Sequence, residues 1–323
     1  MIKTKVTEML GIRHPLILGV MMNISFPKFA AACANTGGLG ILASAIYREA
    51  EPLREAIQET KKLAKEPFAV NMNLFPALQP PDQISHLKVM IDEGVKIIET
   101  SGHKAPADYV GLFKEHDITW IHKCAGVRYA KTAAGLGADI IEVVGWENGG
   151  ATGRFDVGTL VLTPATVDAI DVPVVAGGGI ADGRGVVAAL SLGAEAAIIG
   201  SRMLMTKECP VHDNLKQALC EASIYDTTVI NARIRNEHRV WKNVAAQKVI
   251  ELEASDASDM EIYKASSASG AAADAFIKEG DLTAATISVG QGVGLACDVP
   301  TAKELIDRIM KEAEDIISKF TLA

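Results

Sequence analysis

Eight short apolar runs, separated by helical patterns, are the feature of this sequence that most restricts its fold. Between residues 15 and 199, each run of four to six residues is followed by an amphipathic or alanine-rich stretch. Regular alternation of this kind is typical of a parallel sheet, because neighbouring parallel strands need a crossover connection. Eight such units match a closed barrel, which leaves no sheet edge. We therefore predict a (β/α)8 TIM barrel with strands at residues 15–18, 39–43, 68–73, 95–100, 118–122, 140–144, 172–175 and 196–199.

The helical patterns between these runs complete the predicted barrel. The last of them before strand seven is expected to begin at Thr163-Pro164, because proline favours the first turn of a helix. The predicted helices span residues 26–36, 49–65, 84–93, 107–116, 127–136, 163–170 and 186–190.

The alternation stops after Thr206, where the chain changes character. Residues 209–280 contain helical patterns but no regular succession of strand and helix. We predict that this block is a mainly helical insertion after strand eight, forming a substrate subdomain over the barrel mouth. An amphipathic helix at residues 301–320 is expected to return to the barrel wall. The predicted domains are therefore a barrel of residues 1–208 plus 281–323 and an insertion of residues 209–280.

Composition excludes several classes of function. Of the 323 residues, 49% are hydrophobic and the formal net charge is −8, whereas nucleic-acid binding normally needs a basic face. No apolar run approaches the roughly 20 residues that span a bilayer, and no signal peptide is recognisable, so we expect a cytoplasmic protein that does not bind membranes. The five cysteines are scattered without metal-site spacing. A small-molecule substrate is expected, and a homo-oligomer is compatible with the composition.

Two glycine turns close the last two predicted strands. Gly177, Gly178 and Gly179 follow strand seven, and Gly200-Ser201 follows strand eight. Glycine lets main-chain N–H groups approach an anion closely, and the loops after strands seven and eight of such barrels commonly bind phosphate. The alternative is that these glycines only make tight turns.

The other strand ends are rich in amide and hydroxyl groups and hold one lysine. They show no carboxylate cluster, no metal-ligand constellation and no activated nucleophile. This pattern favours a phosphorylated organic cofactor that supplies the chemistry, and FMN is the natural candidate. Asn71 or Asn73 would then contact the ring edge, and Lys123 would stabilise the negative charge of a reduced flavin. The alternative for Lys123 is a solvated lysine at a strand end.

Several motifs resemble one known family. The segments that carry the resemblance are residues 34–40, 67–71, 121–124, 178–185, 200–202, 206–210 and 288–291. Together they are similar to the nitronate monooxygenase (2-nitropropane dioxygenase) family of FMN-dependent barrels, which includes an NADH:quinone reductase group and flavin-type enoyl-ACP reductases. The chain looks closest to the NADH:quinone reductase group, notably at Ile121-His122-Lys123-Cys124.

The resemblance implies a set of cofactor contacts. Gln291 is expected to close over the flavin, and NADH or NADPH would act as a transient co-substrate. The implied FMN contacts are Met21, Met22, Asn73, Lys123, Gly150, Gly178, Gly179, Gly200 and Ser201.

One departure from the family bears on the reaction. The loop after strand six usually carries a histidine that faces the flavin, and here that position holds Ala151. A methyl group cannot take a proton, so Lys123 and Thr152, a poor base, remain as candidate catalytic residues. The loss favours an oxidoreductase that passes hydride from NAD(P)H or a substrate through flavin N5 to a quinone, enoyl or similar acceptor. The alternatives are a nitronate monooxygenase that works without the histidine and a non-redox barrel that binds a phosphorylated ligand.

A basic run in the insertion is the remaining candidate for binding. Arg233, Arg235, His238 and Arg239 could hold an anionic substrate or the phosphates of NAD(P)H or a CoA-type carrier, or else form a solvated face. Structural roles are expected for His122, Cys124, Met203 and Met205.

Overall fold

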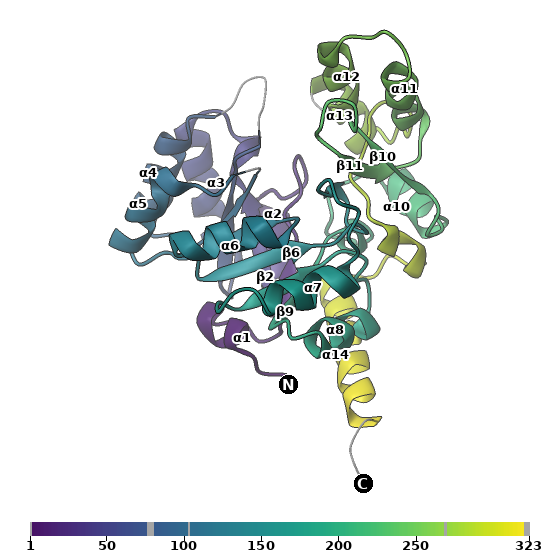
Figure 1. The fold of residues 1–323 in the computed structure, drawn as a ribbon. Coiled ribbons are helices and arrows are strands. Elements are labelled where there is room, and N and C mark those ends of the chain that lie inside the picture. The colour runs from purple at the N-terminus through teal and green to yellow at the C-terminus, as the bar shows by residue number, and fades with distance from the viewer. Residues whose placement is uncertain (1, 76–80, 103, 268–269, 320–323) are drawn as a thin grey trace.

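A closed parallel barrel forms the centre of the computed structural model, which describes residues 2–75, 81–102, 104–267 and 270–319 (Figure 1). Its eight strands follow the order β1-β2-β3-β4-β5-β6-β8-β9. Pairing of β1 with β9, in which Leu18 lies beside Ile199, closes the barrel. The predicted (β/α)8 fold is confirmed.

All eight predicted barrel strands are present, and four of them have the predicted bounds. Burial of most strand residues on both faces explains why these runs are mainly apolar rather than alternating. The strands are β1 (Leu16–Leu18), β2 (Leu39–Ala43), β3 (Phe68–Asn73), β4 (Ile97–Ser101), β5 (Thr119–Cys124), β6 (Ile140–Val144), β8 (Val174–Gly177) and β9 (Ala196–Ile199).

Helices surround the barrel and close its lower end. Val6 and Leu10 of α1 (Lys5–Leu10) belong to the same apolar cluster as the barrel interior, so the cavity that carries the chemistry lies at the opposite end. The outer helices are α2 (Pro27–Ala34), α3 (Ala50–Leu63), α4 (Gln83–Asp92), α5 (Val110–Glu115), α6 (Val127–Leu136), α7 (Thr159–Val167), α8 (Gly183–Ser191) and α14 (Ala302–Lys319).

The predicted start of α7 is wrong. The helix begins at Thr159, four residues before Thr163, and contains Pro164 in its interior. Its first turn is held by Glu147, whose carboxylate accepts hydrogen bonds from the Thr159 N–H at 3.1 and 2.9 Å and from the Thr159 hydroxyl at 3.0 Å. This capping group comes from the loop after β6, so no local pattern around the proline could indicate it.

The insertion is mainly helical, as predicted, with α10 (Asp213–Cys220), α11 (Val244–Glu253), α12 (Asp259–Ser266) and α13 (Gly270–Ile277). It also contains an unpredicted hairpin of β10 (Thr227–Ile230) and β11 (His238–Trp241). β11 pairs with β7 (Gly150–Ala151), so a three-stranded sheet joins the insertion to the loop after β6. Figure 1 shows α11, α12 and α13 grouped beyond the barrel. The boundaries 209 and 280 remain a prediction.

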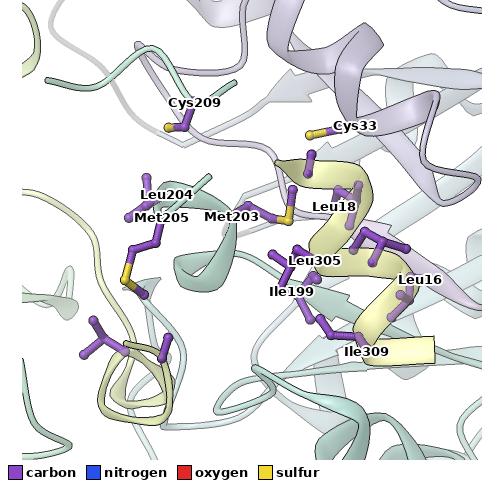
Figure 2. Packing of buried hydrophobic residues seen from close by; sticks show 14 of the residues in the cluster. Leu16, Leu18, Cys33, Ile199, Met203, Leu204, Met205, Cys209, Leu305 and Ile309 are labelled. Atoms are coloured by element: carbon purple, nitrogen blue, oxygen red, sulfur yellow. The ribbon is translucent and has the colours of Figure 1, made fainter. Parts of the chain in front are cut away.

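Figure 2 shows the apolar core that attaches the last helix to the barrel. Leu16 and Ile199, on adjacent strands, belong to the same buried cluster as Leu305 and Ile309 of α14. Met203 and Met205 are fully buried in this cluster, which confirms their predicted core role. The return of the final helix to the barrel wall is confirmed as well.

The described part of the chain has neither a membrane-spanning helix nor a cluster of metal-binding side chains. None of its helices is both long enough and apolar enough to cross a membrane. Within the same residues, no group of three or more histidine, cysteine, aspartate or glutamate side chains is placed to hold a metal ion.

Candidate active site

A cavity of about 870 Å³ opens at the carboxyl ends of the barrel strands. This volume lies in the upper part of the range, about 300–1,000 Å³, that is typical of small-molecule sites. Residues after all eight barrel strands line its floor, whereas β10, β11, α12 and the segment 285–292 line its roof. The cavity therefore lies between the barrel and the insertion.

Glycines form the rim of the cavity after β8 and β9. Gly178 and Gly179 have φ angles of +104° and +71°, which side chains rarely adopt. A Cβ on Gly178 would lie 2.6 Å from the Thr159 hydroxyl oxygen, so this glycine is required for packing. Gly200 differs, because nothing lies within 4 Å of its Cβ position. The main chain at Gly200 is therefore open to the cavity, as a phosphate site requires.

The segment around Gly290 joins the two glycine turns to the loop after β6. The Gly290 N–H donates to Ser201 Oγ at 2.7 Å, and the Gln291 N–H donates to the Glu147 carbonyl at 2.9 Å. A Cβ on Gly149 would lie 2.7 Å from the Gly290 nitrogen. These close main-chain contacts fix the rim in place.

A polar layer lies inside the barrel below the cavity. Lys123 Nζ contacts Glu99 Oε1 at 2.5 Å, and the other Glu99 oxygen accepts a hydrogen bond from Asn71. Asn71 also donates to Ser101 Oγ at 3.1 Å. Glu99 is fully buried, while 19% of the Lys123 side chain is exposed and lines the cavity. The lysine ammonium therefore presents its charge to any occupant of the site.

Glu142 on β6 completes this layer. Its side chain is fully buried, and within the described residues no N–H or hydroxyl group donates to either of its oxygens. It shares a side-chain hydrogen bond with Glu99. Two carboxylates cannot hydrogen-bond unless one of them holds a proton, so Glu142 is a neutral acid that donates to the ionised Glu99.

The ionisation of the layer has clear physical causes. Burial raises the pKa of Glu142 well above its usual value, and the neighbouring Glu99 charge raises it further. Burial alone would raise the pKa of Glu99 too, but the Lys123 ammonium and the hydrogen bonds from Glu142, Lys123 and Asn71 lower it overall. The result is one ion pair plus one neutral acid, with no net charge.

The sequence analysis predicted no carboxylate cluster at the strand ends, and this carboxylate pair lies deeper in the barrel. Glu99 and Glu142 are the third residues of β4 and β6, within the strands rather than at their ends. A signal was present, because each glutamate follows two isoleucines in a run that is otherwise hydrophobic. A charge at such a position requires a buried partner.

Most of the predicted cofactor contacts lie on the cavity. Gln291 does not line it, although Gly290 and Gly292 do. The lining includes Met21, Met22, Asn73, Lys123, Gly150, Gly178, Gly179, Gly200 and Ser201.

Thr152 is not placed to act as a base on a substrate. It is buried outside the cavity lining, and its hydroxyl donates to the Gly153 carbonyl at 3.3 Å. Its N–H donates to the Glu237 carbonyl at 3.2 Å, which anchors β7 to the insertion. Of the two candidate catalytic residues, only Lys123 reaches the cavity.

The basic run of the insertion divides into two pairs. Arg235 and His238 line the cavity. Arg233 instead donates to main-chain carbonyls at the end of α11, including Ser255 O at 2.7 Å. Arg239 is buried and donates to the Trp146 carbonyl and the Thr227 hydroxyl. Two members are thus structural, and two can meet a ligand.

His122 and Cys124 have the expected structural surroundings. His122 is buried, its Nδ1 lies 2.8 Å from the Thr100 hydroxyl, and burial lowers its pKa to about 4. Burial raises the pKa of the Cys124 thiol to about 12, so the thiolate is disfavoured.

Comparison with known proteins places this geometry among oxidoreductases. The sequence model of the nitronate monooxygenase family matches residues 3–312. A CoA-ester dehydrogenase of Rhodococcus jostii, named (3aS,4S,5R,7aS)-5-hydroxy-7a-methyl-1-oxo-octahydro-1H-indene-4-carboxyl-CoA dehydrogenase, is 33% identical over 97% of this chain and 96% of its own length. A probable nitronate monooxygenase of Staphylococcus aureus is 30% identical over 71% of this chain and 76% of its own.

Solved structures agree on the fold. FabK of Thermotoga maritima is 34% identical, has a TM-score of 0.90, and aligns over 99% of this chain and 98% of its own. A nitroalkane oxidase of Streptomyces ansochromogenes shares the fold, with a TM-score of 0.84 at 24% identity and coverage of 98% of this chain and 99% of its own.

Proposed function

The chain belongs to the nitronate monooxygenase family, and from this membership we propose that it is an FMN-dependent oxidoreductase that acts on an acyl thioester. Its membership of an oxidoreductase family rests on nearly full-length similarity. The cofactor, substrate class and electron source are the proposal. Each is supported by residues that line the cavity.

The glycine rim fits the phosphate of FMN. Main-chain amides at Gly178, Gly179 and Gly200, together with Ser201, would hold the phosphate group. Lys123 would lie beside the ring system, where its ammonium favours an anionic reduced state, and Asn73 would contact the ring edge. When bound, FMN accepts or delivers a hydride at N5, which removes the need for a protein nucleophile or a metal.

A cationic outer lining is the observation that carries the substrate class. Arg48, Arg154 and Arg235 are exposed on three separate loops and all line the same cavity. Arginine is suited to phosphate because its planar fork can donate two hydrogen bonds to one group. A thioester on a phosphate-bearing carrier, such as coenzyme A, would place its anionic part on these arginines and its acyl part deeper in the cavity. The name of the Rhodococcus relative supports this class.

Nitronate oxidation is the second candidate, because the Staphylococcus relative bears that name. Ala151 counts against the usual route, since its methyl group offers no base at that position of the cavity wall. Reduced nicotinamide is therefore the favoured source of hydride, delivered transiently over the flavin.

Absorbance of the purified protein tests the proposal. The protein reconstituted with FMN should show flavin bands, and anaerobic NADH or NADPH should bleach them. An α,β-unsaturated acyl-CoA should then restore the colour. If a nitronate bleaches the flavin and neither NADH nor NADPH does so, nitronate oxidation would be the favoured function. Failure to retain FMN at all would leave only a non-redox ligand site.

A further inference from the structure

The cavity contains an imidazole to which the reaction has so far assigned no role. We propose that His238 exchanges the proton with the substrate carbon; this role rests on the proposed function. Among the described residues, His238 is the only histidine that lines the cavity. It belongs to the insertion, not to the barrel, and reaches the site through the three-stranded sheet.

Strand pairing places His238 directly beside Ala151. β11 runs antiparallel to β7, and the two residues are register partners. Directly opposed residues of an antiparallel pair project from the same face of the sheet, with Cβ atoms about 4.5–5.5 Å apart. Both residues line the cavity, and the small Ala151 side chain leaves space for the ring beside it.

Alternation along β11 supports this orientation. Val240, two residues further on, also lines the cavity. Arg239, between them, points to the other side, where it donates to the Trp146 carbonyl at 3.1 Å. His238 and Val240 therefore share the face that looks into the site.

Contacts with Asn236 and Phe75 orient the ring, and the contact with Asn236 indicates its tautomer. His238 Nδ1 lies 3.0 Å from the Asn236 carbonyl oxygen. Because a carbonyl only accepts hydrogen bonds, Nδ1 carries the hydrogen, and Nε2 of the neutral ring holds the lone pair that takes a proton. The ring also meets Phe75 edge-on, with centroids 6.5 Å apart. Phe75 follows β3, so this contact spans from the insertion to the barrel rim.

The proton balance of the proposed reaction requires such a group. When an α,β-unsaturated thioester is reduced, its β-carbon gains a hydride and its α-carbon gains a proton, while reduced nicotinamide supplies the two electrons. The proton leaves Nε2 of the protonated imidazole, which becomes neutral and regains a proton from water. Dehydrogenation runs the same transfers in reverse. With a nitroalkane, the C–H proton would pass to Nε2.

The other candidates in the site are less suitable. Lys123 is held by Glu99 at 2.5 Å, and Thr152 lies outside the cavity lining. Burial also disfavours the Cys124 thiolate. His238 is the cavity-lining group whose ordinary chemistry near neutral pH is proton transfer.

The variant His238→Asn tests the assignment, with His116→Asn, at the end of α5 and outside the cavity lining, as the control. Protein loaded with FMN is reduced anaerobically by NAD(P)H and mixed in D2O with an α,β-unsaturated acyl-CoA or, separately, with a nitroalkane. Deuterium at the substrate carbon is measured by mass spectrometry. We expect His238→Asn to slow proton exchange about 100-fold or more, with FMN binding and bleaching by NAD(P)H within about twofold of wild type.

Two further measurements guard against a purely structural effect. The double variant Ala151→His/His238→Ala moves the imidazole to the opposed position and should recover part of the exchange. In the protein without substrate, ¹⁵N NMR should show His238 with hydrogen on Nδ1.

The outcomes separate the two proposals. If the wild type exchanges protons with the nitroalkane alone, and His238→Asn loses this exchange, the thioester proposal would be rejected but the assignment of His238 would stand. Exchange that survives in His238→Asn would overturn the assignment and leave the thioester proposal intact. A wild-type protein that places deuterium on the carbon of neither the thioester nor the nitroalkane would overturn the assignment too.

Discussion

Lys123 Nζ lies 2.5 Å from Glu99 Oε1, at the boundary between the cavity and the fully buried interior of the barrel. The pair presents a positive charge to the site while its negative partner stays out of solvent. This relationship links the stability of the barrel to the electrostatics of the proposed flavin site.

Replacement of Lys123 by methionine should destabilise the protein by about 3 kcal/mol, because it leaves the buried Glu99 charge without its partner. Urea unfolding monitored by circular dichroism measures the change. The double variant Lys123→Met/Glu99→Gln should recover much of the loss, since both charges are then removed. A double variant no more stable than the single one would show that the ion pair is not what the lysine contributes.

Replacement of Glu142 by glutamine should reduce the pH dependence of stability above pH 5. The folded-state pKa of Glu142 is raised, so the folded protein keeps a proton that the unfolded chain releases above its pKa of about 4.3. Stability of the wild type therefore falls as pH rises from there toward the folded-state pKa. Glutamine stays neutral and can still donate to Glu99.

Free energies of unfolding at pH 5 and pH 8 test this prediction. Glu142→Gln should gain stability relative to wild type between the two values, whereas exposed Glu115→Gln should not. An equal pH dependence in Glu142→Gln and wild type would mean that Glu142 is ionised in the fold.

His122 should contribute a loss of stability in acid. Its folded-state pKa is about 4, lowered mainly by burial, against about 6.5 in the unfolded chain. The stabilisation is complete above pH 6.5 and is lost as pH falls toward 4, by about 3 kcal/mol over the window. Unfolding free energies of wild type and His122→Gln between pH 4.5 and 7 should converge as the pH falls. Parallel curves would contradict a neutral buried imidazole.

Two glycines of the rim should respond differently to alanine. Gly200→Ala should keep the stability of the fold, since its Cβ position is open, but should weaken FMN binding by obstructing the rim. Gly178→Ala should instead destabilise the fold by more than 1 kcal/mol, because the positive φ and the 2.6 Å approach to Thr159 both oppose a side chain. Thermal unfolding and FMN titration distinguish the two effects. Equal FMN affinity of Gly200→Ala and wild type would argue against the phosphate rim.

The barrel could be predicted because its signals are local. Each strand is a short apolar run, and each crossover helix has its own periodicity, so regular spacing was enough to indicate eight units. Glycine turns after β8 and β9 were equally visible. The start of α7 was not, because its stabilising carboxylate, Glu147, lies twelve residues before Thr159 in the sequence.

The polar parts of the site depend on contacts that spacing cannot reveal. Glu99 and Glu142 meet across the barrel interior from β4 and β6, which are not neighbours in the sheet. His238 reaches Ala151 through a pairing that joins a two-residue strand to a hairpin in the insertion. A two-residue strand has no periodicity, so its partner could be found only in the folded molecule.

Anaerobic titration of the FMN-loaded protein tests the central claim most directly. NADH or NADPH should bleach the flavin absorbance, and an α,β-unsaturated acyl-CoA should restore it in proportion to the thioester added. Protein that retains no FMN, or a reduced flavin that the thioester leaves bleached while oxygen or a nitronate reaction restores it, would contradict the account.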